Sequence, residues 1–282
     1  MPHALLASPR RFVASLRRRP ALTVGALAGL LALGGCGGPP PPKVLRLEAM
    51  ELRFKPPAEV PAGPVRIRLV NHDPVWHEAS LLRFTDTTRT LEDYIAAARA
   101  GDEYPSFAED MGGVGFLAPG DSAEVLVELR AGRYAVICWH SDHVMQGMGA
   151  TFTVTGEVPP DAFHAGGAEV RLADGVIPAL TPARGRQVLH VTNAGPAEHE
   201  LAILRLEPGK TYVDFMAWRA AGETGTPPAY SVAGTAALAP GHEIWVIVPW
   251  AAGRYVMVCL LEDSEGHYHA DLGERQEFEV AQ

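Results

Sequence analysis

The sequence predicts an all-β chain of two tandem β-sandwiches, each with one short inserted helix. The chain has 282 residues with 29 Gly and 24 Pro, and 47% of it is hydrophobic. This composition supplies enough apolar surface for real cores and is too rich in Gly and Pro for long helical bundles. Alternating apolar runs recur along the chain, and one half of the sequence aligns with the other. These three observations predict the fold class.

The N-terminus predicts a segment that is removed from the protein. Five arginines precede a 13-residue apolar stretch (21–33), which is too short to span a bilayer and has the length of a signal-peptide core. The stretch ends in Leu-Gly-Gly-Cys36, which resembles the lipobox of bacterial lipoproteins. The resemblance implies a signal peptide and lipobox over 1–36 and lipidation of Cys36. An ordinary secretory signal with an incidental cysteine is the alternative.

The predicted location and charge narrow the class of partner. Lipidation would tether the chain to a membrane in the periplasm or at the cell surface, with the Gly/Pro run 37–42 as a semi-rigid spacer. Beyond residue 35 the chain carries 19 Lys and Arg against 33 Asp and Glu. This formal charge of −14 argues against nucleic acid as a partner.

An internal repeat divides the remaining chain. At an offset of 121 to 122 residues, four segments align: 71–78 with 193–200, 90–94 with 211–215, 117–120 with 238–241, and 131–134 with 252–255. We therefore expect one duplicated domain, with a first copy over 43–155, a linker over 156–165 and a second copy over 166–281.

The local patterns within each copy are those of strands with one helix. The segments 65–70, 124–129 and 150–154 alternate apolar and polar residues and are bounded by turn residues, as half-buried antiparallel strands are. The exception is 90–100, where apolar residues recur at helical spacing behind a possible N-cap, Thr90, with Asp93 three residues on. The segment 210–220 repeats this pattern with Thr211 and Asp214.

Two cysteines occupy equivalent positions in the copies. Cys138 and Cys259 lie 121 residues apart, and each follows an apolar strand. One cysteine per domain cannot form a disulfide within it, and cysteines on repeated strands seldom lie close enough to bridge. In an oxidising compartment each is therefore expected to be a metal ligand or a fully buried residue.

In the first copy the residues around the cysteine suggest a metal site. His77 lies 61 residues before Cys138, His143 follows after four intervening residues, and Met148 after four more. Two imidazoles, a thiolate and a thioether are the ligand set of blue copper, because soft sulfur favours Cu(I) and imidazole suits both oxidation states. A buried structural cysteine is the alternative for Cys138.

At these residues the sequence resembles the cupredoxin family of plastocyanin- and azurin-like blue copper proteins. The segment 132–154 is similar to the family's strand, Cys, loop, His, four residues, Met and strand. The resemblance implies cupredoxin-like Greek-key β-sandwiches, a copper cofactor, and His77, Cys138, His143 and Met148 as ligands. Met145 and His140 are substitute candidates. Glu78 replaces the Asn that follows the first His in many plastocyanins, so the hydrogen bonding behind that ligand is open.

The second copy departs from this pattern. It keeps His199, Cys259 and His269, but Glu274 stands where Met148 stands in the first copy, and nine residues instead of four separate Cys from His. A hard carboxylate lowers the preference for Cu(I). We expect an altered or empty copper site here.

These features favour a membrane-tethered electron-transfer protein with one type 1-like copper, whose negative charge suits a redox partner with a basic face. A cupredoxin-fold scaffold, or a module that sequesters copper without a redox role, is the alternative. A copper oxidase or nitrite reductase is less favoured, because those enzymes place a His immediately before the cysteine. Here those positions are Ile137 and Val258.

Overall fold

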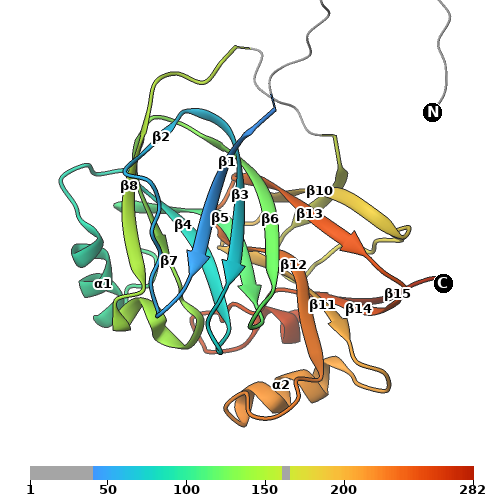
Figure 1. The fold of residues 1–282 in the computed structure, drawn as a ribbon. Helices are drawn as coiled ribbons and strands as arrows, with labels where there is room; N and C mark the ends of the chain where they lie inside the picture. The colour runs from blue at the N-terminus through green and yellow to red at the C-terminus, as the bar shows by residue number, and fades with distance from the viewer. Residues whose placement is uncertain (1–40, 161–165) are drawn as a thin grey trace, which may run out of the picture. The chain divides into compact units, whose positions relative to one another are not determined.

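Two facing β-sheets make up most of the structure, a computed structural model that describes residues 41–160 and 166–282 (Figure 1). The predicted signal peptide, Cys36 and most of the 37–42 spacer lie outside the described residues, as does the 161–165 part of the predicted linker. The predicted all-β class is confirmed.

The elements of the first half include the predicted strands and helix. They are β1 (Lys43–Ala49), β2 (Glu59–Pro61), β3 (Gly63–Asn71), β4 (His77–Phe84), α1 (Leu91–Arg99), β5 (Ala108–Leu117), β6 (Ser122–Leu129), β7 (Gly132–Ile137), the 3-10 segment η1 (His140–Gln146) and β8 (Gly149–Thr155).

The second half has the same sequence of elements except for a counterpart of β2. They are β9 (Ala168–Leu172), β10 (Gly185–Asn193), β11 (His199–Leu206), α2 (Tyr212–Ala220), β12 (Ala229–Leu238), β13 (Glu243–Trp250), β14 (Gly253–Val258), the 3-10 segment η2 (His269–Leu272) and β15 (Arg275–Val280).

Both sheets continue from one half into the other. The six-stranded sheet has the order β1-β3-β6-β13-β10-β9, and the nine-stranded sheet has the order β15-β14-β11-β12-β5-β4-β7-β8-β2. The halves meet in the first sheet where β13 pairs with β6, with Trp245 opposite Leu126. In the second sheet they meet where β12 pairs with β5, at Leu238 and Met111. The pairing of the halves therefore brings the ends of β4 and β11 to the same sheet.

Strand β4 separates two environments because its side chains alternate between the faces of the sheet. Ala79 and Leu81 point into the core between the sheets, whereas Leu82 and Phe84 pack under α1. Strand β11 does the same, with Leu201 and Ile203 in the core. By this alternation the first residue of each strand, a histidine, faces the core and the second, a glutamate, faces away.

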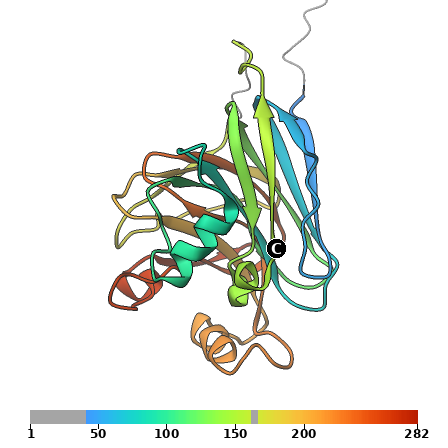
Figure 2. The ribbon, with the colours of Figure 1, turned by 90° about the vertical axis from the view of Figure 1, so that its left-hand side faces the viewer.

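The two predicted helices are confirmed with their caps. Thr90 accepts a hydrogen bond from the Asp93 N–H while the Asp93 carboxylate accepts one from the Thr90 N–H, and Thr211 and Asp214 form the same capping box. Figure 2 shows α1 beside the nine-stranded sheet, where its buried Tyr94 packs against that sheet's outer face. The helices thus cover the face opposite the core.

A bulged strand lies beside the start of β4. The register of β4 with β5 shifts twice, on either side of the pair Ser80 and Gly113. Gly113 has φ of 121°, and a Cβ there would collide with the Ala79 carbonyl oxygen, so only glycine fits. Gly234 is in the equivalent situation against the Leu201 carbonyl oxygen.

Candidate metal centres

Three of the four residues predicted for the first copper site meet in the buried end of the first sandwich. His77 begins β4, Cys138 follows β7, and His143 lies in η1. The Sγ of Cys138 lies 3.7 Å from Nδ1 of His77 and 3.6 Å from Nδ1 of His143, and the two Nδ1 atoms are 3.1 Å apart. The three donor atoms therefore face one another across a space of single-ion size.

Met148, the fourth predicted residue, is fixed beside them by the backbone. Its N–H donates to the His143 carbonyl at 2.9 Å, and its carbonyl accepts from the Cys138 N–H at 3.2 Å. The side chain is fully buried in the hydrophobic core that also contains Cys138. The substitute candidates do not join the group, because Met145 packs under α1 and His140 pairs with Glu223 at 3.1 Å.

Burial keeps the first cluster uncharged. It lowers the pKa of His77, and burial together with the neighbouring His77 and His140 lowers the pKa of His143 to about 4. Burial and the charge of Glu78 raise the pKa of the Cys138 thiol. A thiolate at this position therefore needs a cation beside it, which is what a bound metal ion provides.

Asp73 orients the first histidine, a role that was not predicted. Its Oδ2 lies 2.9 Å from Nε2 of His77, while its two oxygens accept the N–H groups of Glu51 and Leu52 at 2.8 and 3.1 Å. Because a carboxylate can only accept, Nε2 carries the hydrogen and Nδ1 keeps its lone pair for a metal. In the sequence, only the position of Asp73 in a turn four residues before His77 could have indicated this role.

Glu78, at which the sequence left the hydrogen bonding behind His77 open, contacts the surroundings of Cys138 instead of the His77 ring. It is buried, its carboxylate accepts the Trp139 N–H at 2.8 Å, and its own N–H points at Cys138 Sγ at 3.4 Å. It therefore contacts both the Cys138 sulfur and the backbone of the residue that follows it. Glu200 repeats this in the second half, with Leu260 N–H at 3.0 Å and Cys259 Sγ at 3.4 Å.

A second buried cluster contains the residues predicted for the altered site. The ligand atoms of His199, Cys259, His269 and Glu274 all lie within 4.8 Å of one another. Cys259 Sγ is 3.4 Å from His269 Nδ1, and Glu274 Oε2 is 2.8 Å from His199 Nδ1. The Glu274 carboxylate therefore lies among the donor atoms of the two histidines and Cys259.

The backbone gives Glu274 the place of Met148. Its N–H donates to the His269 carbonyl at 3.0 Å, and its carbonyl accepts the Cys259 N–H at 3.1 Å. These are the same two hydrogen bonds that Met148 makes with His143 and Cys138. The longer loop between Cys259 and His269 leaves this register unchanged.

His199 is held between two carboxylates. Its Nδ1 faces Glu274, and its Nε2 lies 3.0 Å from Asp174 Oδ1. Burial lowers the pKa of His199, but these two partners outweigh burial and raise it. The position equivalent to Asp73 is Gly195, where a Cβ would lie only 2.7 Å from His199 Nε2. Asp174, from the turn after β9, supplies the carboxylate instead. The two halves orient their histidines from different loops.

The donor chemistry of both clusters fits copper. The first offers two imidazoles and a thiol with a buried thioether nearby, and the second offers two imidazoles, a thiol and a carboxylate. Each cluster sits where the strand bearing Cys, the strand bearing His and the loop bearing the second His meet at one end of a β-sandwich. This is a cupredoxin-like fold.

Comparisons with solved structures find similarity to copper proteins that match one half of this chain and to others that match most of it. Auracyanin B is 23% identical over 43% of this chain and 94% of its own, with a TM-score of 0.32. Auracyanin A, a "blue" copper protein from Chloroflexus aurantiacus, is 21% identical over 41% of this chain and all of its own, with a TM-score of 0.31. A copper nitrite reductase from Nitrosomonas europaea is 14% identical over 86% of this chain and 95% of its own, with a TM-score of 0.26.

No protein-family model and no curated protein matches the sequence. Within the described part of the cupredoxin-like chain, no helix has the length and apolar character needed to cross a membrane.

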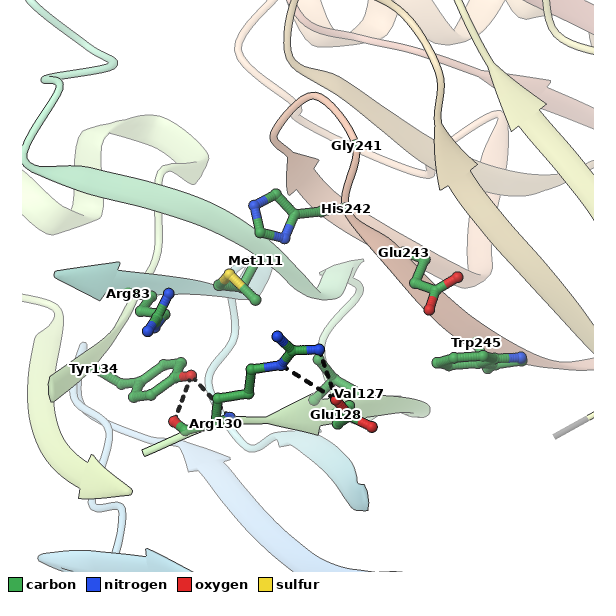
Figure 3. A pocket seen from close by; sticks show the side chains of 10 residues that line it. All are labelled: Arg83, Met111, Val127, Glu128, Arg130, Tyr134, Gly241, His242, Glu243 and Trp245. Carbon is green, nitrogen blue, oxygen red and sulfur yellow. Dashed lines mark hydrogen bonds and ion pairs between the residues drawn. The ribbon is translucent and has the colours of Figure 1, made fainter. Parts of the chain in front are cut away.

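A surface hollow gives access to the first cluster. It has a volume of about 620 Å³, and His143 reaches it together with Trp76, Trp218 and Tyr230. Another hollow, of about 290 Å³, lies between the halves and is lined by Arg83, Arg130 and His242 among others (Figure 3). None of the cluster residues lines this second hollow. The 620 Å³ hollow is therefore the one that bears on the first metal centre.

Proposed function

We propose that the protein is an extracytoplasmic, membrane-tethered copper protein that transfers single electrons through a copper ion held by His77, Cys138, His143 and Met148. The observation that carries this proposal is the buried trio of His77, Cys138 and His143, whose donor atoms lie 3.1 to 3.7 Å apart. When bound, copper supplies a one-electron cycle between Cu(II) and Cu(I).

The surrounding residues suit a site that keeps one geometry in both oxidation states. Asp73 fixes the ring of His77, and the Glu78 carboxylate fixes the backbone directly after Cys138. The Glu78 N–H points at the sulfur and stabilises negative charge on it. Such a preorganised site reduces the rearrangement that accompanies electron transfer.

His143 supplies the route between the buried site and the surface. It is 6% exposed and lines the aromatic hollow with Trp76 and Trp218. We propose that a redox partner docks over this hollow, and that the net charge of −14 beyond residue 35 favours a partner with a basic face. Electron-transfer rates should then fall as ionic strength rises.

A visible spectrum and a redox titration of the copper-loaded protein test this function. We expect an intense thiolate-to-copper absorption that disappears on reduction and returns on oxidation. Tight Cu(I) binding without this band would favour the alternative, a copper-sequestering module. Failure to bind copper at all would favour a scaffold with relic ligand residues.

We propose that the second cluster binds copper more weakly or not at all. Glu274 faces His199 Nδ1 and also accepts the Gly175 N–H at 3.1 Å. A metal ion at this position competes with an existing hydrogen-bonded arrangement, whereas Met148 in the first half makes no such contact with His77. Metal analysis should therefore find more than one bound copper ion per chain only when the concentration of free copper is high.

The membrane tether is tested separately. We propose that the protein begins at Cys36 after processing and is lipidated there, in the periplasm or at the cell surface. Cys36→Ser should move the protein from the membrane fraction to the soluble fraction. A variant that stays fully membrane-bound at low and high salt would contradict the lipoprotein assignment and leave the copper assignment intact.

A further inference from the structure

A cavity of about 270 Å³ is lined by Glu78 and Glu200, which point away from the core of the nine-stranded sheet and adjoin the first histidine of each metal cluster. Glu78 and Ser80 reach it from β4, and Glu200 reaches it from β11. Glu103 and Tyr104, from the loop after α1, and Glu262, from the loop after Cys259, complete its polar lining. Both halves of the chain therefore contribute oxygen atoms to one space.

The two central glutamates are held in place by the backbone. One oxygen of Glu78 accepts the Trp139 N–H, and one oxygen of Glu200 accepts the Leu260 N–H. Glu78 and Glu200 are only 8% and 7% exposed. Each carboxylate retains lone pairs for a further ligand. Each half therefore presents one such carboxylate, held in the same way, to the same cavity.

Ser80 provides an independent sign of a ligand. Its side chain is 1% exposed, it lines the same cavity, and its Oγ has no hydrogen-bond partner. A buried hydroxyl normally finds a partner, because leaving it unpaired forfeits the hydrogen bonds that it would make with water. An unpaired hydroxyl among carboxylates is an available ligand oxygen.

We propose that this cavity binds one divalent cation of the Ca²⁺ class, with Glu78, Glu200 and Ser80 as central ligands and Glu103, Glu262 and Tyr104 within its lining. All of these donors are oxygen atoms, which suit a hard cation rather than copper. No lysine, arginine or histidine is among the residues that the described chain contributes to the lining. Ca²⁺ also accepts the irregular arrangement of ligands that several loops and strands provide.

The site would link the two halves beside both metal centres. Glu78 contacts the Cys138 sulfur and the N–H of the residue after it, and Glu200 does the same at Cys259. A cation between them would stabilise the pairing of β12 with β5, the two strands that lie between β11 and β4 and join the halves in this sheet. This role is separate from electron transfer and does not depend on it.

Calorimetric titration of the copper-loaded full chain with CaCl₂ at fixed ionic strength tests the proposal. We expect one saturable site per chain, a smaller response to Mg²⁺, and at least tenfold weaker Ca²⁺ binding in Glu200→Gln. Ser80→Ala, which removes one neutral ligand, should weaken binding less. The matched control is Glu207→Gln, an exposed glutamate on the same half, which should leave affinity within twofold of wild type.

Two outcomes overturn the proposal. One is a wild-type titration without a one-to-one site. The other is Ca²⁺ binding in Glu200→Gln and Ser80→Ala equal to that of Glu207→Gln, which would place the ion on the acidic surface. Should Glu200→Gln not fold, Ser80→Ala and Glu78→Gln carry the same comparison. Cys138→Ser should keep the Ca²⁺ site, which separates this proposal from the copper assignment.

Discussion

The carboxylate of Asp73 lies 2.9 Å from Nε2 of His77 and leaves Nδ1 of that ring facing Cys138 and His143. Burial alone would raise the pKa of Asp73, but the hydrogen bonds that it accepts lower it, so it is ionised near neutral pH. A histidine whose far nitrogen donates to a carboxylate is fixed in one tautomer and one orientation. The ring of His77 is therefore set for a metal before one binds.

Asp73→Asn should weaken copper binding at the first site by about 10- to 100-fold, the range typical of partners behind metal ligands. The amide nitrogen of Asn cannot accept the hydrogens of both His77 and Leu52 as the Oδ2 of Asp73 does. Competition with a chelator of known affinity, followed by the visible band, measures the change. Asp174→Asn makes the same substitution behind His199 and is the matched control. An equal loss in both variants would contradict the assignment of Asp73 to the first site.

Glu274→Met should give the second half a working copper site. The substitution removes the carboxylate from Nδ1 of His199 and restores a thioether at the position equivalent to Met148. It also removes the acceptor of the Gly175 N–H, at a cost of about 1 kcal/mol in the free energy of unfolding. The copper-loaded variant should show about twice the wild-type thiolate absorption per chain. Unchanged absorption at saturating copper would show that more than Glu274 disables the second cluster.

The sequence carried most of the information about the metal centres because their ligand residues sit at fixed points of repeated strands. His77 begins a strand, Cys138 directly follows one, and Met148 directly precedes the last strand of its half, so the order of residue types indicated the group. Glu274 could be matched to Met148 by counting back from the final strand, and the backbone hydrogen bonds of the two residues agree with that match.

The supporting residues were harder to predict because different loops supply them. Asp73 precedes its histidine by four residues, whereas Asp174 reaches His199 from the turn after another strand. No spacing common to the two halves marks this role. Glu78 is buried although it points away from the core, because Trp139 and the loop after α1 lie over that face of the sheet.

The isolated first half, 43–155, is expected to fold and to self-associate. It has its own strands on both sheets, but separation from the second half exposes the edge of β6, where Leu126 is 4% exposed. An unpaired apolar edge pairs readily with another chain. Sedimentation and urea unfolding measure these two properties. Loss of cooperative unfolding would show that the halves share one indispensable core, and a stable monomer would show that the exposed edge is protected in another way.

His190 should stabilise the second half in a pH-dependent way. Burial lowers its pKa, but Glu169 and Glu243, at 2.9 and 2.7 Å, outweigh burial and raise it. A group with a raised folded-state pKa contributes stability that is fully present below the unfolded value of about 6.5 and is lost as pH rises through the folded value. His190→Gln should therefore reduce the free energy of unfolding more at mildly acidic than at alkaline pH. The difference should stay below about 1 kcal/mol because the pair is partly solvated. A difference that grows with pH would contradict this account.

The central claim is that the first cluster holds the functional copper, and visible spectra of copper-loaded Cys138→Ser and Cys259→Ser test it most directly. Both thiols are fully buried and occupy equivalent positions, so each variant controls for the other. We predict that Cys138→Ser loses most of the thiolate-to-copper absorption and that Cys259→Ser keeps most of it, because only the first thiol is accompanied by two histidines and a buried methionine. Retention of the band in Cys138→Ser together with its loss in Cys259→Ser would contradict the claim and assign the working site to the second half.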